Sequence, residues 1–239
     1  EFFHAVGLLI LEGYGLTETV APAAVNRAEC FKFGTVGQLI PGMEAKIASD
    51  GELLLRGQGL FSGYYKDPDA TAQAIDAGGW FHTGDIAVID DEGFIVITDR
   101  KKDIIVTAGG KNVAPQNIEN LLRTMPLLDH VLVVGDRRKY LTALITVDRR
   151  ELEAFARREN IFPGDGGRLT EHPRVQKAVD EHIQKVNQRL APYEQIKRYK
   201  ILPDEFSQEK GELTPTLKLR RRDILEKYGD VIDALYAER

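Results

Sequence analysis

Four short segments combine residue types that could hold a nucleotide. The first, Tyr14-Gly15-Leu16-Thr17-Glu18-Thr19, places an aromatic ring, a glycine turn, a hydroxyl and a carboxylate directly after an apolar run. Tyrosine can stack on a base, threonine can hydrogen-bond a phosphate oxygen, and glutamate can hold Mg²⁺ beside the phosphates. Loops at strand ends are where layered α/β folds place nucleotide sites. An ordinary polar turn is the alternative that these residues leave open.

The second segment is Trp80-Phe81-His82-Thr83-Gly84-Asp85, just before a predicted hairpin. A carboxylate placed by a Thr-Gly turn can accept both hydroxyls of a ribose in a bidentate arrangement. Asp85 could equally cap backbone amides where the chain enters the hairpin. No chemistry is assigned to His82.

The third and fourth segments are rich in cations. Asp99-Arg100-Lys101-Lys102-Asp103 is followed by Gly109-Gly110-Lys111-Asn112, where the glycine pair permits close approach of the backbone to a ligand. Three cations in a row are typical of a solvated loop, and a glycine pair is common in turns. In the fourth segment, Glu212–Arg220, Lys218 follows a proline-containing loop and precedes a basic helix. These residues alone fit a capped helix start as well as a reactive lysine.

The elements that must position these residues are strands and turns over the first hundred positions. The apolar start, Glu1–Leu11, predicts a buried strand that runs into a loop at Gly13-Tyr14-Gly15, and a core strand without a preceding partner suggests a fragment. Asp67-Pro68 predicts the start of a short helix, because Asp can cap free amides and Pro suits the first turn. Alternation and turn residues predict two hairpins: Glu44–Ile47 with Glu52–Arg56, and Ile86–Ile89 with Phe94–Thr98.

The remaining residues alternate helices and strands. A helix is predicted from Pro115, another from Asp148 to about Glu159 with a capping-box-like start, and a longer one along the apolar stripe from Val175 to Leu190. Val131–Val134 and Leu141–Val147 predict a strand pair, and Lys197–Leu202 a third strand of the same sheet. Two units are therefore expected to meet near Arg100–Asp103, and the second is long enough to fold alone.

Composition restricts the class of protein. The 239 residues are 43% hydrophobic and 29% charged, which is typical of a folded globular chain. The 37 acidic residues outnumber the 32 basic ones, so the sequence does not indicate a nucleic-acid partner. Cys30 is the single cysteine, which excludes an internal disulfide and fits a reducing compartment. The apolar start is too short to span a bilayer.

Together, the four segments resemble those of the adenylate-forming superfamily, which includes acyl-CoA synthetases, luciferases and peptide-synthetase adenylation domains. They occur in the family's order and at roughly its separations, and Gly51-Glu52-Leu53 through Gly57 with Gly63-Tyr64 matches a further family segment. The resemblance covers nearly the whole chain and is greatest to long-chain fatty acyl-CoA synthetases, which carry Thr-Pro-Thr before the lysine. It implies an α+β fold: residues 1–100 end a large domain made mostly of β hairpins, and residues 101–239 form a small lid domain with a short sheet flanked by helices.

The resemblance also implies roles for individual residues. Tyr14 would lie against the adenine, Thr17 would contact the α-phosphate, and Glu18 would coordinate Mg²⁺. Asp85 would bind the ribose hydroxyls with help from Arg100. In the second half, Lys102 would be the hinge, Gly109 and Gly110 would line the route of the pantetheine arm, and Lys218 would be the adenylation lysine, although Leu217 stands where the family often has glycine.

The expected activity is ATP- and Mg²⁺-dependent activation of a long-chain fatty acid through an acyl-adenylate, with transfer to CoA. The partners are then fatty acid, ATP and CoA, in a cytoplasmic location with peripheral membrane contact left open. A carrier-protein thiol as acceptor and a non-catalytic lid or interaction module are the alternatives. The 239 residues contain no Ser/Thr/Gly-rich phosphate loop, so we expect them to be inactive in adenylation by themselves.

Overall fold

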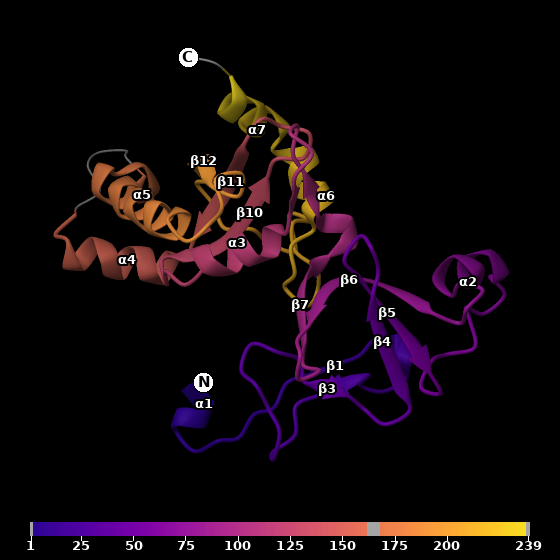
Figure 1. Cartoon of the computed structure of the whole chain (residues 1–239). Coiled ribbons are helices and arrows are strands. Elements are labelled where there is room, and N and C mark those ends of the chain that lie inside the picture. The colour runs from indigo at the N-terminus through magenta and orange to yellow at the C-terminus, as the bar shows by residue number, and fades with distance from the viewer. Residues whose placement is uncertain (1, 162–167, 238–239) are drawn as a thin grey trace. The chain divides into compact units, whose positions relative to one another are not determined.

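The structure is a computed structural model that describes residues 2–161 and 168–237. It divides into two compact units, Glu1–Asp103 and Ile104–Arg239, and each is described by itself (Figure 1). The division falls after the short 3₁₀-helix η2 (Lys101–Asp103), whereas the sequence places the boundary after Arg100.

The first unit contains a four-stranded antiparallel sheet in the order β4-β5-β6-β7. Its strands are β4 (Met43–Ile47), β5 (Glu52–Gly57), β6 (Phe81–Ile89) and β7 (Ile95–Arg100). Both predicted hairpins are confirmed by the pairing of β4 with β5 and of β6 with β7. A smaller sheet joins β1 (Gly13–Tyr14), β2 (Ala24–Val25) and β3 (Gln38–Leu39).

The core of this unit lies along β5. Leu53 and Leu55 are completely buried, and they pack with Ala87 on β6 and Ile95 on β7. Burying a leucine or isoleucine side chain stabilises a fold by roughly 1.5–3 kcal/mol, so this central strand holds the sheet in place. The predicted helix at Asp67-Pro68 is confirmed as α2 (Pro68–Ala74), where the Asp67 carboxylate accepts a hydrogen bond from the Ala70 amide at 2.9 Å.

The predicted buried strand at Glu1–Leu11 is wrong. Residues Phe2–Ala5 form a single helical turn, α1, and Leu8, Leu9 and Ile10 are each about half exposed or more, at 57%, 48% and 59%. A strand needs a neighbour to pair its backbone groups, and within the described residues no strand pairs with residues 8–11. Local helical hydrogen bonds, such as that from the Val6 amide to the Phe2 carbonyl, are formed instead.

The second unit is built on a three-stranded sheet, β10-β11-β12. Strands β10 (Leu128–Val134) and β11 (Leu141–Val147) are antiparallel, and β12 (Ile196–Ile201) lies parallel to β11. All three predicted strands are therefore confirmed in one sheet. A two-stranded hairpin of β8 (Ile105–Val106) and β9 (Asn112–Val113) precedes it in the chain.

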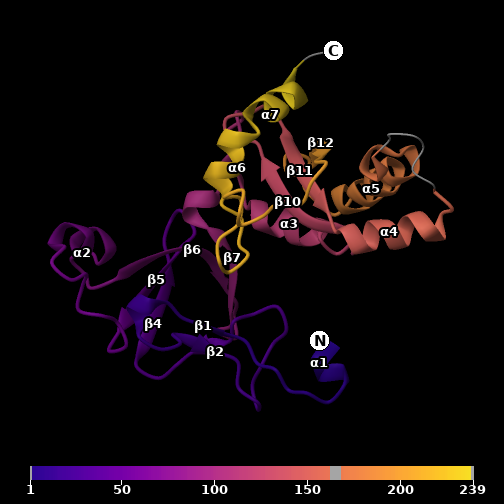
Figure 2. The same cartoon turned by 180° about the vertical axis from the view of Figure 1, so that it is seen from behind.

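Helices cover both faces of this sheet, as the two opposite views show (Figures 1 and 2). Val131, Val133 and Ile145 pack with α3 (Pro115–Leu122), α4 (Arg149–Arg158) and α5 (Pro173–Asn187). Leu132 and Leu144, which point to the opposite face, pack with α6 (Arg221–Lys227) and α7 (Gly229–Tyr236). Every side chain of β11 is buried, because both of its faces are covered.

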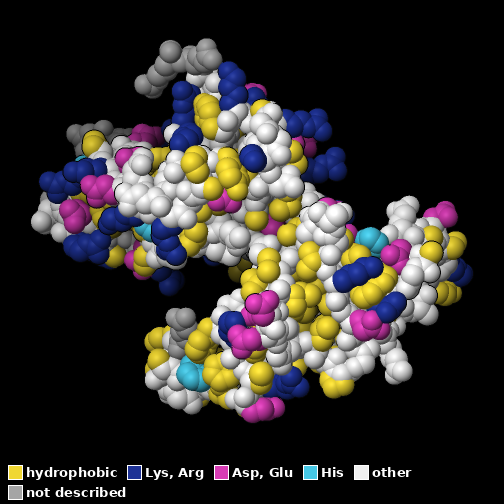
Figure 3. Space-filling view, in the orientation of Figure 1, with side chains coloured by type: hydrophobic (Ala, Val, Ile, Leu, Met, Phe, Trp, Pro, Cys, Tyr) yellow, Lys and Arg dark blue, Asp and Glu magenta, His cyan; other side chains and the backbone are white. Residues whose placement is uncertain are grey.

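The predicted helices of this unit are confirmed within a few residues. The α4 helix begins after Asp148, whose carboxylate accepts from the Glu151 amide at 2.9 Å. The described residues contain no helix that is both long and apolar enough to cross a bilayer. On the face shown in Figure 3, cationic and anionic side chains lie on both units. The fold is α+β, as the sequence predicts.

Candidate functional site

Three of the predicted nucleotide residues lie in contact. The Tyr14 hydroxyl donates to Oδ2 of Asp85 at 2.5 Å, and the Arg100 Nε lies 2.8 Å from Oδ1 of the same carboxylate. Asp85 is 3% exposed, whereas about half of the Arg100 side chain is open to solvent. The structure therefore brings together residues that are up to 86 positions apart in the chain (100 − 14).

Local structure explains this meeting. Asp85 on β6 lies directly opposite Arg100 on β7 in the antiparallel register. The Thr83 hydroxyl donates to the Leu53 carbonyl at 2.7 Å and accepts from the Asp85 amide at 3.1 Å, which fixes the part of β6 that carries Asp85. The Thr83-Gly84 turn predicted before the hairpin is therefore wrong: these residues lie inside β6, where the register against β5 is irregular. Gly15, directly after β1, lies against residues 21–22. A Cβ at Gly15 would lie 2.9 Å from the Ala21 carbonyl oxygen, so this close approach requires glycine.

The electrostatics of the cluster keep Tyr14 protonated. Burial raises the pKa of the Tyr14 phenol, and the hydrogen bond to the Asp85 carboxylate raises it further. Tyr14 is thus a fixed donor, and Arg100 supplies a compensating charge. A carboxylate can accept about four hydrogen bonds, so Asp85 retains acceptor sites after binding both partners.

Glu18 is held by a residue to which the sequence assigned no role. The Tyr64 hydroxyl donates to Oε1 of Glu18 at 2.8 Å, and this hydrogen bond raises the pKa of the Tyr64 phenol. Glu18 and Thr17 both belong to η1 (Thr17–Thr19), whose backbone is fixed by the buried Thr19 hydroxyl. The Thr17 side chain is exposed and makes no hydrogen bond among the described residues.

The donor set fits Mg²⁺ in the form that nucleotide sites use. Mg²⁺ takes oxygen ligands and is bound by one or two carboxylates together with phosphate oxygens. Glu18 retains Oε2 for such a contact while Tyr64 holds its other oxygen. No larger cluster of His, Cys, Asp or Glu suited to a metal occurs in the part of the chain that the structure describes.

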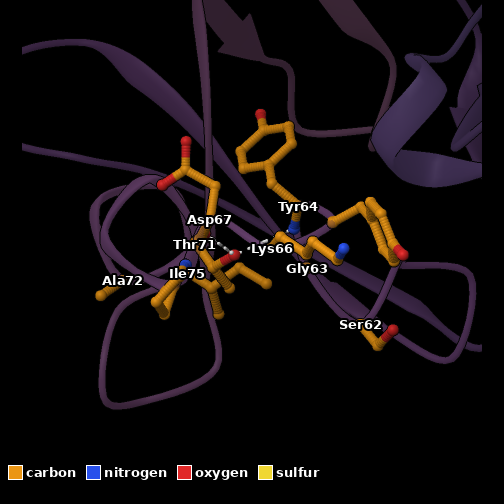
Figure 4. Close-up of a pocket in the computed structure, with 10 residues that line it drawn as sticks. Ser62, Gly63, Tyr64, Lys66, Asp67, Thr71, Ala72 and Ile75 are labelled. Atoms are coloured by element: carbon orange, nitrogen blue, oxygen red, sulfur yellow. Dashed lines mark hydrogen bonds between the residues drawn. The ribbon is translucent and has the colours of Figure 1, made fainter.

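A pocket of about 770 Å³ lies beside Tyr64, between the loop that precedes α2 and α2 itself (Figure 4). The Tyr64 backbone amide donates to the Thr71 hydroxyl at 2.9 Å, which ties the loop to the helix. Gly63, at φ 142°, lies against Thr71, where a side chain would clash at 2.7 Å. None of Tyr14, Asp85 and Arg100 lines this pocket, whereas Tyr64, the partner of Glu18, does.

The chain changes character at the predicted hinge. Arg100 is paired with Asp85, and the Lys101 Nζ lies 2.7 Å from Asp50 and 2.9 Å from Glu52. The side chain of the next residue, Lys102, makes no ion pair or hydrogen bond to the described residues. Lys101 is therefore the last residue before the predicted hinge whose side chain is held by ion pairs.

In the second unit, Gly109 and Gly110 form the exposed turn of the β8–β9 hairpin. The Gly110 amide donates to the Thr107 carbonyl at 2.8 Å, with Gly110 at φ 74°. Gly110 is required by its backbone conformation. A Cβ at Gly109 would meet only the Thr107 hydroxyl at an ordinary 3.9 Å, so Gly109 keeps the turn surface open without being sterically necessary.

Lys218 is presented by a closed loop. The Thr214 amide donates to the Lys218 carbonyl at 2.8 Å, the Lys218 amide to the Thr214 hydroxyl at 3.0 Å, and the Lys218 side chain is exposed. Leu217 adopts φ 60°, a conformation that favours glycine. The backbone here has the shape for which a glycine is suited, although this chain carries leucine.

Three buried acidic residues that sequence analysis did not assign hold these segments. Glu52 accepts from the Gly84 amide and contacts His82 and Lys101. Glu212 accepts from the Ser207 amide, Lys227 and Tyr228 at the base of the Lys218 loop. Glu119 on α3 pairs with Arg221 at the start of α6. Their partners lie up to 102 residues away in the chain. A glutamate inside an apolar strand or helix pattern is the one sequence signal that could have indicated these three acidic residues.

The fold and this site define a member of the AMP-binding enzymes. Residues 102–239 match the AMP-binding enzyme C-terminal domain, and residues 1–65 match the AMP-binding enzyme domain. The chain therefore belongs to this adenylate-forming family, as the motifs indicate.

Among individual relatives, the chain is 43% identical over 237 residues to the long-chain-fatty-acid–CoA ligase FadD15 of Mycobacterium bovis, covering 99% of this chain and 39% of the relative. It is 36% identical to the long-chain-fatty-acid–CoA ligase ACSBG1 of Bos taurus, covering all of this chain and 36% of the relative. The chain thus spans about two-fifths of the length of these curated relatives.

A solved structure shares the fold. The adenylation domain of a carboxylic acid reductase from Segniliparus rugosus, in complex with AMP and a co-purified carboxylic acid, superposes with a TM-score of 0.77 at 26% identity. The match covers 98% of this chain and 36% of that structure.

Proposed function

We propose that this chain forms the ribose-binding edge and the lysine-bearing lid of a ligase that activates a long-chain fatty acid as an acyl-adenylate and transfers it to CoA. The cluster of Tyr14, Asp85 and Arg100 carries the proposal. It places a buried carboxylate, with acceptor sites to spare, beside an exposed cation. The identity to long-chain-fatty-acid–CoA ligases supports the acid and the acceptor.

The first half-reaction requires a cation that can reach both reactants. When a carboxylate attacks the α-phosphate of ATP, two anions approach, and negative charge spreads over the phosphoryl oxygens. Lys218, an exposed ammonium on a closed loop, would bridge these oxygens and reduce their repulsion. Thr17 would hydrogen-bond the α-phosphate, and Glu18 with Mg²⁺ would offset the charge of the phosphates.

The second half-reaction requires that lysine to leave. The thiol of CoA attacks the same carbonyl carbon, and Lys218 near that carbon would obstruct it. Rotation of the backbone at Lys102 would withdraw the lid and bring the Gly109-Gly110 turn to the route of the pantetheine arm. A cytoplasmic location, with peripheral membrane contact for the lipid substrate, belongs to the same proposal.

Binding of AMP to the 239-residue chain tests the site directly. Calorimetry should detect weak binding, and Asp85→Asn should weaken it at least about fivefold, because a charged acceptor becomes a neutral one. Asp91→Asn, an exposed residue in the turn between β6 and β7, is the matched control and should bind as the parent does. Absence of AMP binding by the folded parent chain would contradict the nucleotide role and favour a non-catalytic interaction module.

A second candidate function keeps adenylation and changes the acceptor to a carrier-protein thiol. It is favoured by the likeness to an adenylation–carrier didomain of carboxylic acid reductase, with a TM-score of 0.76 at 26% identity. A full-length protein that contains this chain should be assayed with CoA and with a phosphopantetheine-loaded carrier. Faster transfer to CoA supports the first proposal, and faster transfer to the carrier supports the second.

A further inference from the structure

We infer that Glu52 is a positioning residue that holds both the irregular stretch of β6 carrying Asp85 and the Lys101 side chain, immediately before the proposed pivot at Lys102. The inference deepens the proposed function, on which its catalytic meaning rests. The contacts that carry it all lie within the first unit.

Glu52 uses its two carboxylate oxygens for two different segments. Oε1 accepts from the Gly84 amide at 2.9 Å, one residue before Asp85. Oε2 lies 2.9 Å from the Lys101 Nζ and 2.9 Å from the His82 Nδ1. One side chain therefore connects the stretch of β6 proposed to bind ribose to the residue that precedes the proposed hinge.

Burial makes these contacts necessary. Glu52 is 3% exposed at the start of the central strand β5, where a carboxylate without partners would be strongly destabilising. Its partners must therefore stay in place while Glu52 is ionised. Gly84 adopts φ 69° at the register irregularity of β6, a conformation that could relax toward regular strand if its amide lost its acceptor.

Lys101 is held on two sides. Asp50, in the turn between β4 and β5, contacts the same ammonium at 2.7 Å. The hydrogen bonds to Asp50 and Glu52 raise the pKa of the Lys101 side chain. With Arg100 held by Asp85, the side chains of two consecutive residues are anchored to the sheet immediately before Lys102.

Through these contacts, Glu52 connects two events of the proposed reaction, the binding of ribose and the rotation of the lid. Ribose hydroxyls would bind to Asp85 on the stretch of β6 that Glu52 supports, and the lid would rotate about Lys102, the residue after Lys101, which is the other partner of Glu52. Glu52 would transmit position and does not touch the reacting atoms, so it is not a catalytic residue.

Amide hydrogen exchange on the 239-residue chain tests the inference. Glu52→Gln should accelerate exchange about threefold to tenfold in two peptides, residues 81–86 and 99–104, because it loses charge-assisted hydrogen bonds. Lys101→Gln should accelerate exchange in residues 99–104 and leave 81–86 unchanged. Glu44→Gln, which breaks an exposed ion pair with Arg56 on the same sheet, is the matched control and should alter neither peptide.

The pattern of the results separates positioning from a general loss of stability. A uniform acceleration over all four strands of the sheet, or none in either peptide, would overturn the inference. Should Glu52→Gln fail to fold, Lys101→Gln still decides, since unchanged exchange in residues 99–104 would refute the anchor. AMP calorimetry on the parent judges the proposed function separately, because the exchange pattern does not depend on nucleotide.

Discussion

The Tyr14 hydroxyl donates a hydrogen bond of 2.5 Å to Asp85, which lies 71 residues away in the chain. It joins the end of the small sheet to the centre of the large one. Since Asp85 is buried and charged, the contact should contribute to the stability of the first unit as well as to the geometry of the site.

Replacing Tyr14 by Phe removes this donor and keeps the ring. We expect the free energy of unfolding of the first unit to fall by about 1.5–3 kcal/mol, the range for hydrogen bonds to charged groups. The sole tryptophan, Trp80, lies in that unit, so urea titration followed by its fluorescence reports the unit selectively. Tyr65→Phe, at a side chain that is 87% exposed, should change stability by less than about 0.5 kcal/mol. Equal effects of the two substitutions would contradict the assignment.

Acid should destabilise both units through Glu52 and Glu212. Burial raises the pKa of each carboxyl, but the hydrogen bonds, chiefly those from Lys101 and Lys227, outweigh it and lower each pKa below the ordinary value of 4.5. A group with a lowered pKa in the folded state stabilises the fold above that ordinary value. The contribution is lost as the pH falls below 4.5 through the lower pKa of the folded state.

Urea midpoints measured between pH 7 and pH 3 check this expectation. Glu52→Gln should flatten the acid decline of the Trp80 transition, and Glu212→Gln that of the second unit followed by circular dichroism. A decline in the variants as steep as in the parent chain would show that other carboxylates dominate.

Leu217→Gly should stabilise the loop that presents Lys218. Leucine at φ 60° destabilises the fold by about 1–2 kcal/mol. Glycine removes this strain, but the greater conformational entropy of the unfolded chain with glycine offsets about 0.5–1 kcal/mol of the gain. The expected net gain is about 0.5–1 kcal/mol in the free energy of unfolding of the second unit. Leu225→Gly, inside α6, is the opposite case and should destabilise by about 1 kcal/mol. A loss of stability at position 217 would refute the strain.

Lys218→Ala should separate the two half-reactions in a full-length ligase that contains this chain. Acyl-adenylate formation should fall by at least about 10²–10³, and thiolysis of supplied acyl-adenylate should be largely retained. Lys210→Ala, which removes another exposed lysine paired with Asp204, should leave both steps unchanged. Equal loss of both steps in Lys218→Ala would mean that the role is misassigned.

The 239 residues alone should not turn over. Incubation with ATP, Mg²⁺ and palmitate at high protein concentration should release no pyrophosphate, because the sequence contains no phosphate loop rich in Ser, Thr and Gly. A full-length protein that contains this chain, assayed under the same conditions, is the comparison. Release at enzyme-like rates from the 239-residue chain would refute this expectation.

Local sequence determined the elements and the candidate segments. Hairpin turns, the Asp67 and Asp148 caps and the apolar stripes depend on residues within a few positions of each other, and the corresponding elements formed as predicted. The apolar start fails this rule, because a strand exists only where another strand pairs with it.

Tertiary structure alone decided which side chains meet. The pairing of Tyr14 with Asp85 and of Tyr64 with Glu18, and the contacts of Glu52, depend on strand register and chain crossings that a linear pattern does not contain. For Asp85 and Glu52 the physical reason is burial: a carboxylate removed from water must find donors, and the fold determines which distant residues can supply them. The sequence by itself thus determined the inventory of groups and their local conformation, and the fold determined their partners.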